Sequence, residues 1–406
     1  MLSVTQNSDY YAKGIPAQTS QQTIKQCVRD MKSFFAAIKD YKENPSRYTG
    51  KPKLPGYHKK GGHTMAILTN QDVRLIESLH GYEAKLLLTK LRMQVGALPS
   101  NLTLKEVRIL PNNGSYLMTF IFTFPQEKKQ LQKPKRIAAI DLGVRNLMSV
   151  TNNCGMPCLL YRGGVVKSVN QHYNKKIATI MSKETIGSKK KFIPTDEYYK
   201  VTIKRNDQIL DFMHKVAKHL ILWCVENRID TLVVGENKYW KQEVSLGYKE
   251  NQKFVQIPFD TLKEMLAYLA QEQGIRFVRT EESYTSKASF VDGDPIPVYN
   301  EEEPKQYSFS GVRGPKSYKG NVRKQGFHGL YQTKDGTIMN SDLNGSANIL
   351  RKAYPHAFDN STVDFNNVQI IIHPDYEKQQ RLQVRQKEGY VVSHAKKKRL
   401  NRKQVA

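Results

Sequence analysis

The chain has 406 residues, which is enough for two or three domains that each bury a hydrophobic core. Its 64 Lys and Arg residues against 37 Asp and Glu residues give a formal charge of +27 at pH 7 and favour a polyanionic partner such as nucleic acid. The sequence shows no apolar run near the roughly 18 residues that a membrane span requires and no signal-peptide pattern, so we expect no membrane partner.

The four cysteines indicate a reducing compartment. Cys27, Cys154, Cys158 and Cys224 are too few and too scattered for a disulfide framework, so we expect a cytoplasmic protein. Cys154 and Cys158 are close enough in sequence to share a metal ion, but no second Cys or His pair follows at the spacing of a zinc finger. We therefore interpret these two cysteines as free thiols on a turn.

The first predicted element is an amphipathic helix over residues 21–41, where apolar residues recur at helical spacing. Residues 44–62 then combine prolines, glycines and lysines, a composition that predicts an extended basic strap. Two interpretations of the strap remain open: its lysines contact phosphates, or they lie on a solvated loop. The lysines concerned are Lys51, Lys53, Lys59 and Lys60.

Residues 64–124 have the composition of β-structure. Over 116–124, aromatic side chains alternate with other residues, which predicts a strand with one aromatic face. The segment 125–136 is rich in Lys and Gln and carries two prolines. It predicts a linker, and we place a domain boundary there.

A second domain begins with three short apolar segments. They lie at 137–140, 147–150 and 158–161 and predict a three-stranded meander. A strongly amphipathic helix over 209–224 is expected to cover the resulting sheet.

Two further strands extend this sheet. They are predicted at 231–234 and 275–280, with a helical pattern at 259–273 between them. This is the spacing of a βαβ unit, which implies parallel pairing. The fold class of the domain is therefore α/β.

The last part of the chain is less regular. Residues 292–334 are rich in Gly, Pro, Lys and Tyr without a clear period and predict an inserted loop or small lid. A final helix begins near Asp342. Beyond residue 354 the pattern weakens, and the basic end of the chain predicts a disordered tail.

Acidic residues stand where three of these elements end or begin. Asp141 follows the first core strand, Glu281 and Glu282 follow the strand at 275–280, and Asp342 starts the last helix. Sites in open α/β sheets form beyond the carboxyl ends of strands, so we expect these carboxylates to converge. Convergent carboxylates that hold two Mg²⁺ ions are the apparatus of phosphodiester hydrolysis. Taken singly, Asp141 could close a turn, Glu282 could be a solvated loop acid and Asp342 could cap its helix.

Two strings around these acids resemble the TnpB family of transposon-encoded, RNA-guided nucleases. AAIDLGVRNLMSV at 138–150 is similar to the first RuvC motif of the family, and NSDLNGSANILRK at 340–352 is similar to its third. Other segments, such as VVGENKYWKQE and TEESYTSK, are also similar, and the resemblance extends from residue 15 to residue 354.

The resemblance implies an α/β RNase H-like (RuvC) nuclease core, preceded by a helical recognition segment and a β-rich, barrel-like wedge domain. It places the recognition segment and strap at 1–62, the wedge at 63–134, the nuclease at 135–354 with its insert at 292–334, and a basic, disordered tail at 355–406. It further implies an RNA-guided DNA endonuclease of the prokaryotic cytoplasm, associated with the nucleoid. Its guide RNA, an omega RNA, would pair with target DNA, which two Mg²⁺ ions on Asp141, Glu282 and Asp342 would help to cut.

The third carboxylate departs from the common pattern of the family. In common members a glutamate ends the fourth core strand, but here Gly235 stands at that place and Glu236 comes one residue later. A shift of one residue on a strand turns a side chain to the other face of the sheet. A branch of the family, similar to the Fanzor proteins, takes this carboxylate from the adjoining strand, where Glu282 stands in EESYTS. The resemblance therefore implies Glu282, with Glu236 and Glu281 as alternatives.

Two further departures concern the insert and the start of the chain. The cysteine pairs that form a zinc site in the last RuvC segment of the family are absent, so we expect no structural zinc. The insert is then expected to be held by aromatic packing, or to become ordered only on nucleic acid. The aromatic residues are Phe290, Tyr307, Phe309 and Tyr318. The chain also starts late relative to the family, which implies a shortened natural form in which self-association or another partner supplies the missing N-terminal surface.

Three sets of residues are predicted to contact nucleic acid, each with a structural alternative. They are Lys238, Trp240 and Lys241 after a core strand, Thr285, Ser286 and Lys287 after the candidate glutamate, and Asn170, Asn174 and Lys175 on a helix-like stretch. The tryptophan would stack on a base between two phosphate-bound lysines, or cover a hydrophobic edge. The second set would grip the scissile strand, or cap its loop. The two asparagines are i, i+4 neighbours that would line a guide channel, or lie on a solvated basic face.

Two other functions remain open from the sequence. A nuclease-dead, RNA-guided DNA-binding repressor of the same family has no chemical need for Asp141 and Asp342, so their presence argues against it. A DDE-type transposase that acts without RNA is compatible with the order of the strands and the long insert. The TnpB-like motifs argue against this second alternative.

Overall fold

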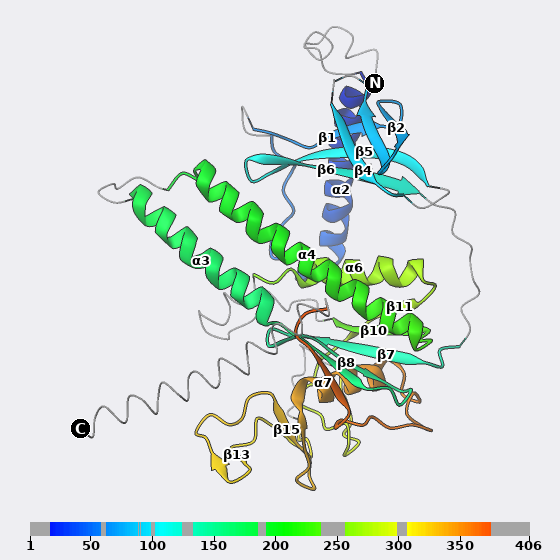
Figure 1. The fold of residues 1–406 in the computed structure, drawn as a ribbon, viewed down its shortest axis with the longest axis vertical. Helices are drawn as coiled ribbons and strands as arrows, with labels where there is room; N and C mark the ends of the chain where they lie inside the picture. Colours follow the sequence, from blue (N-terminus) through cyan, green and yellow to red (C-terminus); the bar gives the residue numbers. More distant parts are fainter. Residues whose placement is uncertain are drawn as a thin grey trace. The chain divides into compact units, whose positions relative to one another are not determined.

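The computed structural model describes residues 17–57, 62–87, 89, 91–98, 102–123, 133–185, 192–236, 256–298 and 307–374. The chain divides into two compact units, Met1–Lys128 and Lys129–Ala406 (Figure 1). Their boundary falls inside the segment 125–136, where the linker is expected from the sequence.

The described part of the first unit begins with a long helix. α2 (Ala17–Glu43) covers the helix predicted there, and one turn of 3-10 helix, η2 (Pro45–Arg47), follows it. Tyr48 fastens this end by donating a hydrogen bond to Asp40 Oδ2 at 2.8 Å. The strap that follows contains no helix or strand over residues 48–57, in agreement with its proline-rich and glycine-rich composition.

Two small antiparallel sheets complete the described part of the first unit. One has the strand order β1-β5-β6 and the other β2-β3-β4. The strands are β1 (Ala66–Thr69), β2 (Val73–Ser78), β3 (Gly81–Leu86), β4 (Arg92–Gly96), β5 (Thr103–Asn112) and β6 (Ser115–Thr123). Leu68 and Val107 from the first sheet share one hydrophobic core with Ala84 and Leu86 from the second. The β-structure predicted for this region is confirmed.

A six-stranded mixed sheet with the order β11-β10-β7-β8-β9-β17 lies at the centre of the second unit. Its strands are β7 (Ile137–Leu142), β8 (Asn146–Asn152), β9 (Cys158–Arg162), β10 (Thr231–Glu236), β11 (Arg276–Glu281) and β17 (Val368–Ile371). β7, β8 and β9 pair antiparallel, which confirms the predicted meander. β10 pairs parallel with both β7 and β11, as the βαβ spacing predicts.

Side chains along β7 alternate between the two faces of this sheet. Ala138 and Ile140 belong to a core on one face, and Ala139 belongs to a core on the other face together with Ile349. The first face is covered by α3 (Gly164–Thr185), α4 (Asp196–Glu226) and α6 (Phe259–Glu272), and the second by α7 (Ser341–Ala353) (Figure 1). Asp141, two residues after Ala139, therefore lies on the face that α7 covers.

α4 begins well before the apolar pattern that predicts it. Thr195 caps the helix by accepting a hydrogen bond from the Tyr198 N–H, and Asp196 and Glu197 place negative charge in the first turn. The turns before Ile209 contain no buried residue, and there Thr202 Oγ1 lies 3.3 Å from Tyr173 Oη on α3. No helix in the described residues is long and apolar enough to span a bilayer.

The insert is held partly by the predicted aromatic side chains. Tyr307 and Phe309 pack against Tyr284, Phe290 packs against Phe358 and Phe365, and Tyr318 packs against Phe327. The insert also contains short strands, namely β12 (Val312–Arg313), β13 (Ser317–Tyr318), β14 (Asn321–Val322) and β15 (Leu330–Gln332), and β15 pairs with β16 (Ile338–Asn340), which follows the insert.

Two aspartates add polar contacts that the sequence did not predict. The Asp294 carboxylate accepts hydrogen bonds from the N–H of Ser289 at 2.8 Å and from the N–H and hydroxyl of Ser310 at 3.0 and 2.6 Å. Asp292 accepts hydrogen bonds from the Ser289 hydroxyl and the Lys334 N–H. These contacts join the two described ends of the insert to each other.

The expectation of a disordered tail from residue 355 is wrong for residues 355–374. β17 pairs parallel with β9 at the edge of the sheet. Ile371 belongs to the core on the α4 face, and Val363 to a core with Leu343 and Ala347 of α7. The signal was weak because β17 is short and two of its four residues are exposed.

Candidate functional site

Asp141 stands near the end of β7, directly across from a glycine of α7. A Cβ atom at Gly345 would lie 2.6 Å from Asp141 Oδ2, closer than real Cβ atoms come to such an atom. Glycine therefore leaves room for the carboxylate. This close approach explains why glycine stands at position 345 in the interior of α7, although glycine lowers helix stability by about 1 kcal/mol relative to alanine.

Gly345→Ala is therefore expected to displace the Asp141 carboxylate. A displacement of about 1 Å at a reacting centre lowers the rate by about a hundredfold. The free energy of unfolding changes less, because the higher helix propensity of alanine offsets the unfavourable contact with Asp141. The variant is expected to melt within a few degrees of wild type while losing about a hundredfold in the DNA cleavage that the resemblance implies. Gly164→Ala on α3 is the control, because a Cβ there meets nothing within 4 Å. Equal cleavage by both variants would contradict the prediction.

Asp342 lies in the first turn of α7, one turn before Gly345. The N-cap interpretation of Asp342 is wrong, because Asn340 caps the helix by accepting hydrogen bonds from the N–H groups of Asp342 and Leu343. This leaves the Asp342 carboxylate free for other contacts. It accepts a hydrogen bond from Asn146 Nδ2 at 2.8 Å and lies 3.5 Å from Arg313 Nη2.

Glu282 follows β11 and lies over Gly235 of β10. A Cβ atom at position 235 would stand 2.5 Å from Glu282 Oε2 and 2.7 Å from Ile349 Cδ1 on α7. Gly235 therefore faces α7, and the space beside it is filled by the Glu282 side chain. A larger residue at 235 would displace this carboxylate.

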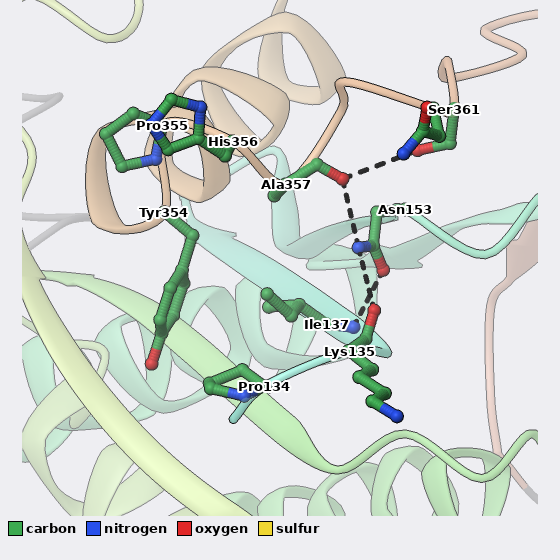
Figure 2. A pocket seen from close by; sticks show the side chains of 10 residues that line it. Pro134, Lys135, Ile137, Asn153, Tyr354, Pro355, His356, Ala357 and Ser361 are labelled. Carbon is green, nitrogen blue, oxygen red and sulfur yellow. Dashed lines mark hydrogen bonds between the residues drawn. The ribbon is translucent and has the colours of Figure 1, made fainter. Parts of the chain in front are cut away.

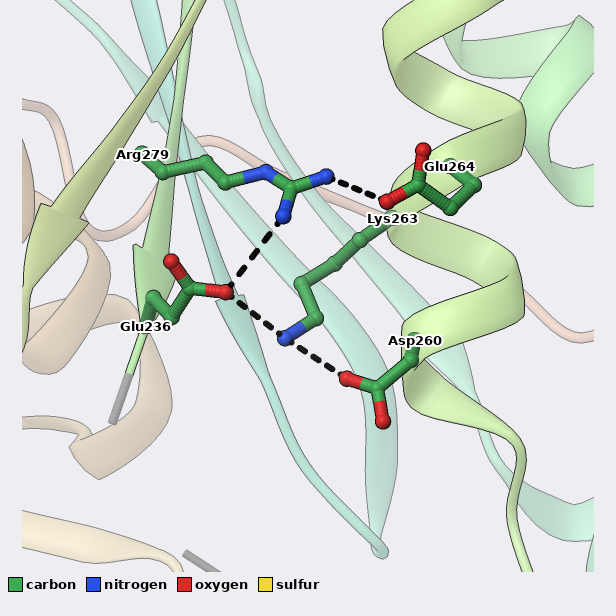
Figure 3. A network of polar contacts seen from close by, with 5 residues as sticks. All are labelled: Glu236, Asp260, Lys263, Glu264 and Arg279. Atoms are coloured by element: carbon green, nitrogen blue, oxygen red, sulfur yellow. Dashed lines mark hydrogen bonds and ion pairs between the residues drawn. The ribbon is translucent and has the colours of Figure 1, made fainter. Parts of the chain in front are cut away.

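The other two glutamates weighed from the sequence are held in ion pairs. Glu236 points toward α6, where its Oε1 lies 3.3 Å from Lys263 Nζ and 3.6 Å from Arg279 Nη1 (Figure 3). Glu281 pairs with Lys352 and accepts a hydrogen bond from the Ser283 N–H at 2.6 Å. Glu282 differs from both, because its charge acts on Asp141.

The structure brings Asp141, Glu282 and Asp342 close enough to interact electrostatically. Burial raises the pKa of Asp141 well above its ordinary value, the charges of Asp342 and Glu282 raise it further, and Arg313 opposes the shift. Burial also raises the pKa of Glu282 to about 7, against the opposing charge of Lys263. A negative charge on Asp141 or Glu282 is therefore unfavourable in the chain when no additional positive charge compensates it.

The chemistry of these donors fits Mg²⁺, a hard cation that prefers oxygen ligands. Among the described residues, no group of three or more His, Cys, Asp or Glu side chains is already gathered in an arrangement that could hold a metal ion. The fit of the site to Mg²⁺ therefore rests on the carboxylate oxygens of the three acids and on their negative charge. A further oxygen is at hand, because the Ser149 hydroxyl is buried opposite Asp141 on β8 and has no hydrogen-bond partner within the described part of the chain.

Two family models match the chain in successive segments. Residues 121–241 match the family described as a probable transposase (OrfB_IS605), and residues 259–349 match the Cas12f1-like TNB domain. The chain is similar to TnpB-type transposases. Asp141 lies in the first matched segment, and Glu282 and Asp342 lie in the second.

The individual proteins that resemble this chain do so at low sequence identity. The TnpB-like protein ORF457 of Acidianus two-tailed virus is 27% identical over 236 residues, which is 56% of this chain and 45% of that protein, so the chain spans less than half of it. The cryo-EM structure of a Cas12f1-sgRNA-target DNA complex has a TM-score of 0.36 at 12% identity, over 86% of this chain and 89% of that chain. The cryo-EM structure of a CRISPR-Cas12f ternary complex has a TM-score of 0.39 at 13% identity, over 89% and 79%.

The loop after Glu282 is fastened to the polar side of α7. Asn348 Nδ2 donates hydrogen bonds to the carbonyl oxygens of Thr285 and Ala288 at 2.9 and 2.7 Å. Thr285 is buried and its hydroxyl donates to the Glu282 carbonyl oxygen at 2.8 Å, so it caps the loop, as the alternative interpretation holds. Ser286 is half-buried beside Gly345, and Lys287 is exposed. Contact of this set with nucleic acid stays a prediction.

The asparagines of α3 are held inside the second unit. Asn170 is buried and accepts a hydrogen bond from Arg205 Nε at 2.8 Å. Asn174 exchanges two hydrogen bonds with the side chain of Gln256. The alternative of a solvated face is therefore wrong for Asn170, because its amide joins α3 to α4. Lys175 is exposed.

The remaining candidates divide between exposed and undescribed positions. Lys51 and Lys53 are exposed on the strap. Their contact with phosphate stays a prediction. The candidates that lie outside the described residues are Lys59, Lys60, Lys238, Trp240 and Lys241.

Two residues at the site were missed from the sequence. Arg313 belongs to the insert, whose irregular composition carries no signal for its approach to Asp342. Asn146 lies within the string that resembles the first RuvC motif, so the sequence did contain a signal for its place at the site. It links Asp342 to Arg162, which donates a hydrogen bond to Asn146 Oδ1 at 2.7 Å.

A pocket of about 450 Å³ lies at the opposite end of β7 from Asp141 (Figure 2). Its walls include Pro134, Tyr354 and Asn153. Asn153 donates hydrogen bonds to the carbonyl oxygens of Lys135 and Ala357. The pocket contains none of the three acids, so it is separate from the candidate site.

Proposed function

We propose that this chain is an RNA-guided DNA endonuclease of the TnpB type, which hydrolyses target DNA that is paired to a guide RNA. The observation that carries the proposal is that the charges of Glu282 and Asp342 both act on the buried Asp141, although the three residues come from elements far apart in the sequence. Buried charges are costly unless a partner compensates them, so this convergence favours a cation site. The similarity to the transposase family and the charge of +27 support nucleic acid as the substrate.

In this proposal the second unit is a RuvC-like nuclease with an RNase H-type sheet. The antiparallel meander β7-β8-β9, joined to the parallel strands β10 and β11, supports that assignment. The first unit would supply the helical recognition segment, α2, and a wedge built from its two small sheets.

Asp141, Glu282 and Asp342 would hold the Mg²⁺ ions. Bound ions would lower the pKa of the attacking water and offset the charge that develops on the leaving oxygen. The residues of the chain orient these ligands, since Asn146 donates a hydrogen bond to Asp342 and Gly345 leaves room for Asp141. Arg313 adds positive charge beside Asp342, where it would attract a phosphate oxygen.

The proposal is tested by purifying the chain together with the RNA that it binds in its host and sequencing that RNA. A DNA duplex complementary to the guide segment is then incubated with the complex in Mg²⁺. We expect cleavage that depends on complementarity and stops when EDTA is added. Binding of this duplex without cleavage would instead identify a nuclease-dead DNA-binding protein, and absence of RNA would contradict the proposal.

The binding of RNA is expected to weaken steeply with salt. Each phosphate that a Lys or Arg neutralises releases counterions, so affinity should fall by about a thousandfold between about 50 and 200 mM salt. Filter binding measures the slope. Lys51→Gln with Lys53→Gln should lower the slope by about two if the strap contacts phosphates. A salt-independent affinity would contradict the prediction.

A further inference from the structure

Three polar side chains of β8 face α7, and one of them has no hydrogen-bond partner among the described residues. Asn146 donates a hydrogen bond to Asp342 at 2.8 Å. Thr151 Oγ1 lies 3.0 Å from Ser346 Oγ. Ser149 stands between these two residues of β8, and its hydroxyl is the unpaired one. The contacts between β8 and α7 therefore satisfy both neighbours of Ser149 along the strand but leave Ser149 itself unsatisfied.

The register of the sheet places the Ser149 side chain beside Asp141. Ser149 on β8 is the antiparallel partner of Asp141 on β7, and partners of this kind have their side chains on the same face of the sheet. Thr151, which contacts Ser346 of α7, lies two residues further on and therefore on the same face as Ser149. Cβ atoms of directly opposite residues are about 4.5–5.5 Å apart. The Ser149 hydroxyl and the Asp141 carboxylate are thus neighbours without a direct hydrogen bond.

A buried hydroxyl without a partner is unfavourable, because it gives up its hydrogen bonds to water and receives none from the protein. Ser149 is 1% exposed, so bulk solvent does not supply the partner. Alanine would fill the same place in the strand without this penalty. Buried polar groups that the folded chain leaves unpaired occur where a protein binds water or an ion. The unpaired hydroxyl therefore indicates that something outside the chain binds beside Asp141.

We propose that the Ser149 hydroxyl is part of the cation site and holds a water molecule of the hydration shell of the ion at Asp141. Mg²⁺ gives up its water reluctantly and keeps several water molecules when one or two carboxylates bind it. A water molecule joins polar groups that lie too far apart for a direct hydrogen bond. Ser149 acts through this water and is a positioning residue. The inference rests on the proposed function, because it needs a cation at Asp141.

The test is calorimetric titration of the RNA-free full chain with Mn²⁺ alone. Ser149→Ala is expected to bind Mn²⁺ about tenfold more weakly than wild type, because hydrogen-bond partners around a metal site commonly contribute about 10- to 100-fold to its affinity. In EDTA the same variant should melt no lower than wild type, because alanine removes an unpaired buried hydroxyl. Metal affinity should thus fall without a loss of stability.

Thr151→Val is the matched control, because it removes a hydroxyl from the same face of the same strand. The Thr151 hydroxyl is paired with Ser346, so its loss should lower the melting temperature in EDTA and leave the affinity for Mn²⁺ at the wild-type value. A merely structural role of Ser149 would make the two variants alike. Unchanged Mn²⁺ affinity in Ser149→Ala, or an equal loss of affinity in Thr151→Val, would overturn the inference.

Ser149→Cys decides where Ser149→Ala fails to fold, judged by its melting curve. A thiol occupies nearly the same place as the hydroxyl but is only a weak hydrogen-bond donor and acceptor. We again expect Mn²⁺ to bind about tenfold more weakly. Wild-type affinity in this variant would also contradict the role of Ser149.

Asp141→Asn separates this inference from the proposed function. If that variant binds Mn²⁺ as wild type does, the cation site itself is wrong, and the proposed function fails with it. If Asp141→Asn loses binding but Ser149→Ala keeps the wild-type affinity, only the role of Ser149 fails.

Discussion

Replacing Asp141 with Asn is expected to slow cleavage of the target DNA in Mg²⁺ by about a thousandfold or more. Asparagine keeps the shape of the side chain but removes its charge. Loss of a charged metal ligand removes several kcal/mol of charge stabilisation, and each ~1.4 kcal/mol is a factor of ten in rate. Cleavage by the guide-loaded complex in single-turnover conditions measures the effect.

Two controls accompany this variant. Binding of target DNA, measured by gel shift, should be unchanged, because backbone contacts elsewhere supply most of the affinity. In EDTA the variant should melt no lower than wild type, because burial and two neighbouring carboxylates disfavour a charge at Asp141 in the folded chain. Cleavage at the wild-type rate would remove Asp141 from the site.

The second large effect distinguishes Glu282 from Glu236. Glu282→Gln should lower the cleavage rate by about a thousandfold or more, as expected for a metal ligand. Glu236→Gln should cost less than about tenfold at saturating Mg²⁺, because Glu236 faces α6 and is paired with Lys263 and Arg279. The two variants remove the same charge from residues at the ends of adjacent strands, so each controls for the other.

Both variants are assayed in one experiment, with DNA binding measured beside cleavage. The opposite result, an inactive Glu236→Gln and a fully active Glu282→Gln, would show that the conventional glutamate position functions here despite the shift of one residue. Loss of activity in both variants with loss of DNA binding would indicate a folding defect and calls for melting curves. We expect neither outcome.

The parts of the site that follow from strand geometry could be predicted from the sequence. Asp141 was placed after a core strand because apolar residues fill the strand before it. The argument that a shift of one residue changes the face of a strand applies to Gly235 and Glu236, which lie against α7 and α6 respectively. Parallel pairing of β10 with β11 then brings Glu282 beside the glycine.

Contacts made by irregular or polar segments could not be predicted in this way. Arg313 reaches Asp342 from an insert without periodicity, and its partner is set by tertiary packing alone. Asn170 was assigned to a guide channel or a solvated face because it is an i, i+4 neighbour of Asn174, whereas its hydrogen bond from Arg205 depends on how α3 packs against α4. β17 was not predicted because an edge strand with exposed residues shows little alternation between apolar and polar side chains.

The separation of the three acids along the chain bears on how the protein is made. Ribosomes release the chain from its N-terminus, so β7 emerges long before α7, and domains fold as units. A nascent chain that has been synthesised beyond Asp141 but not yet as far as Asp342 would contain the first of the three acids without the last. The activity proposed here would therefore appear only late in synthesis, once α7 has docked on the sheet, so that unfinished chains would not cut nucleic acid near the ribosome.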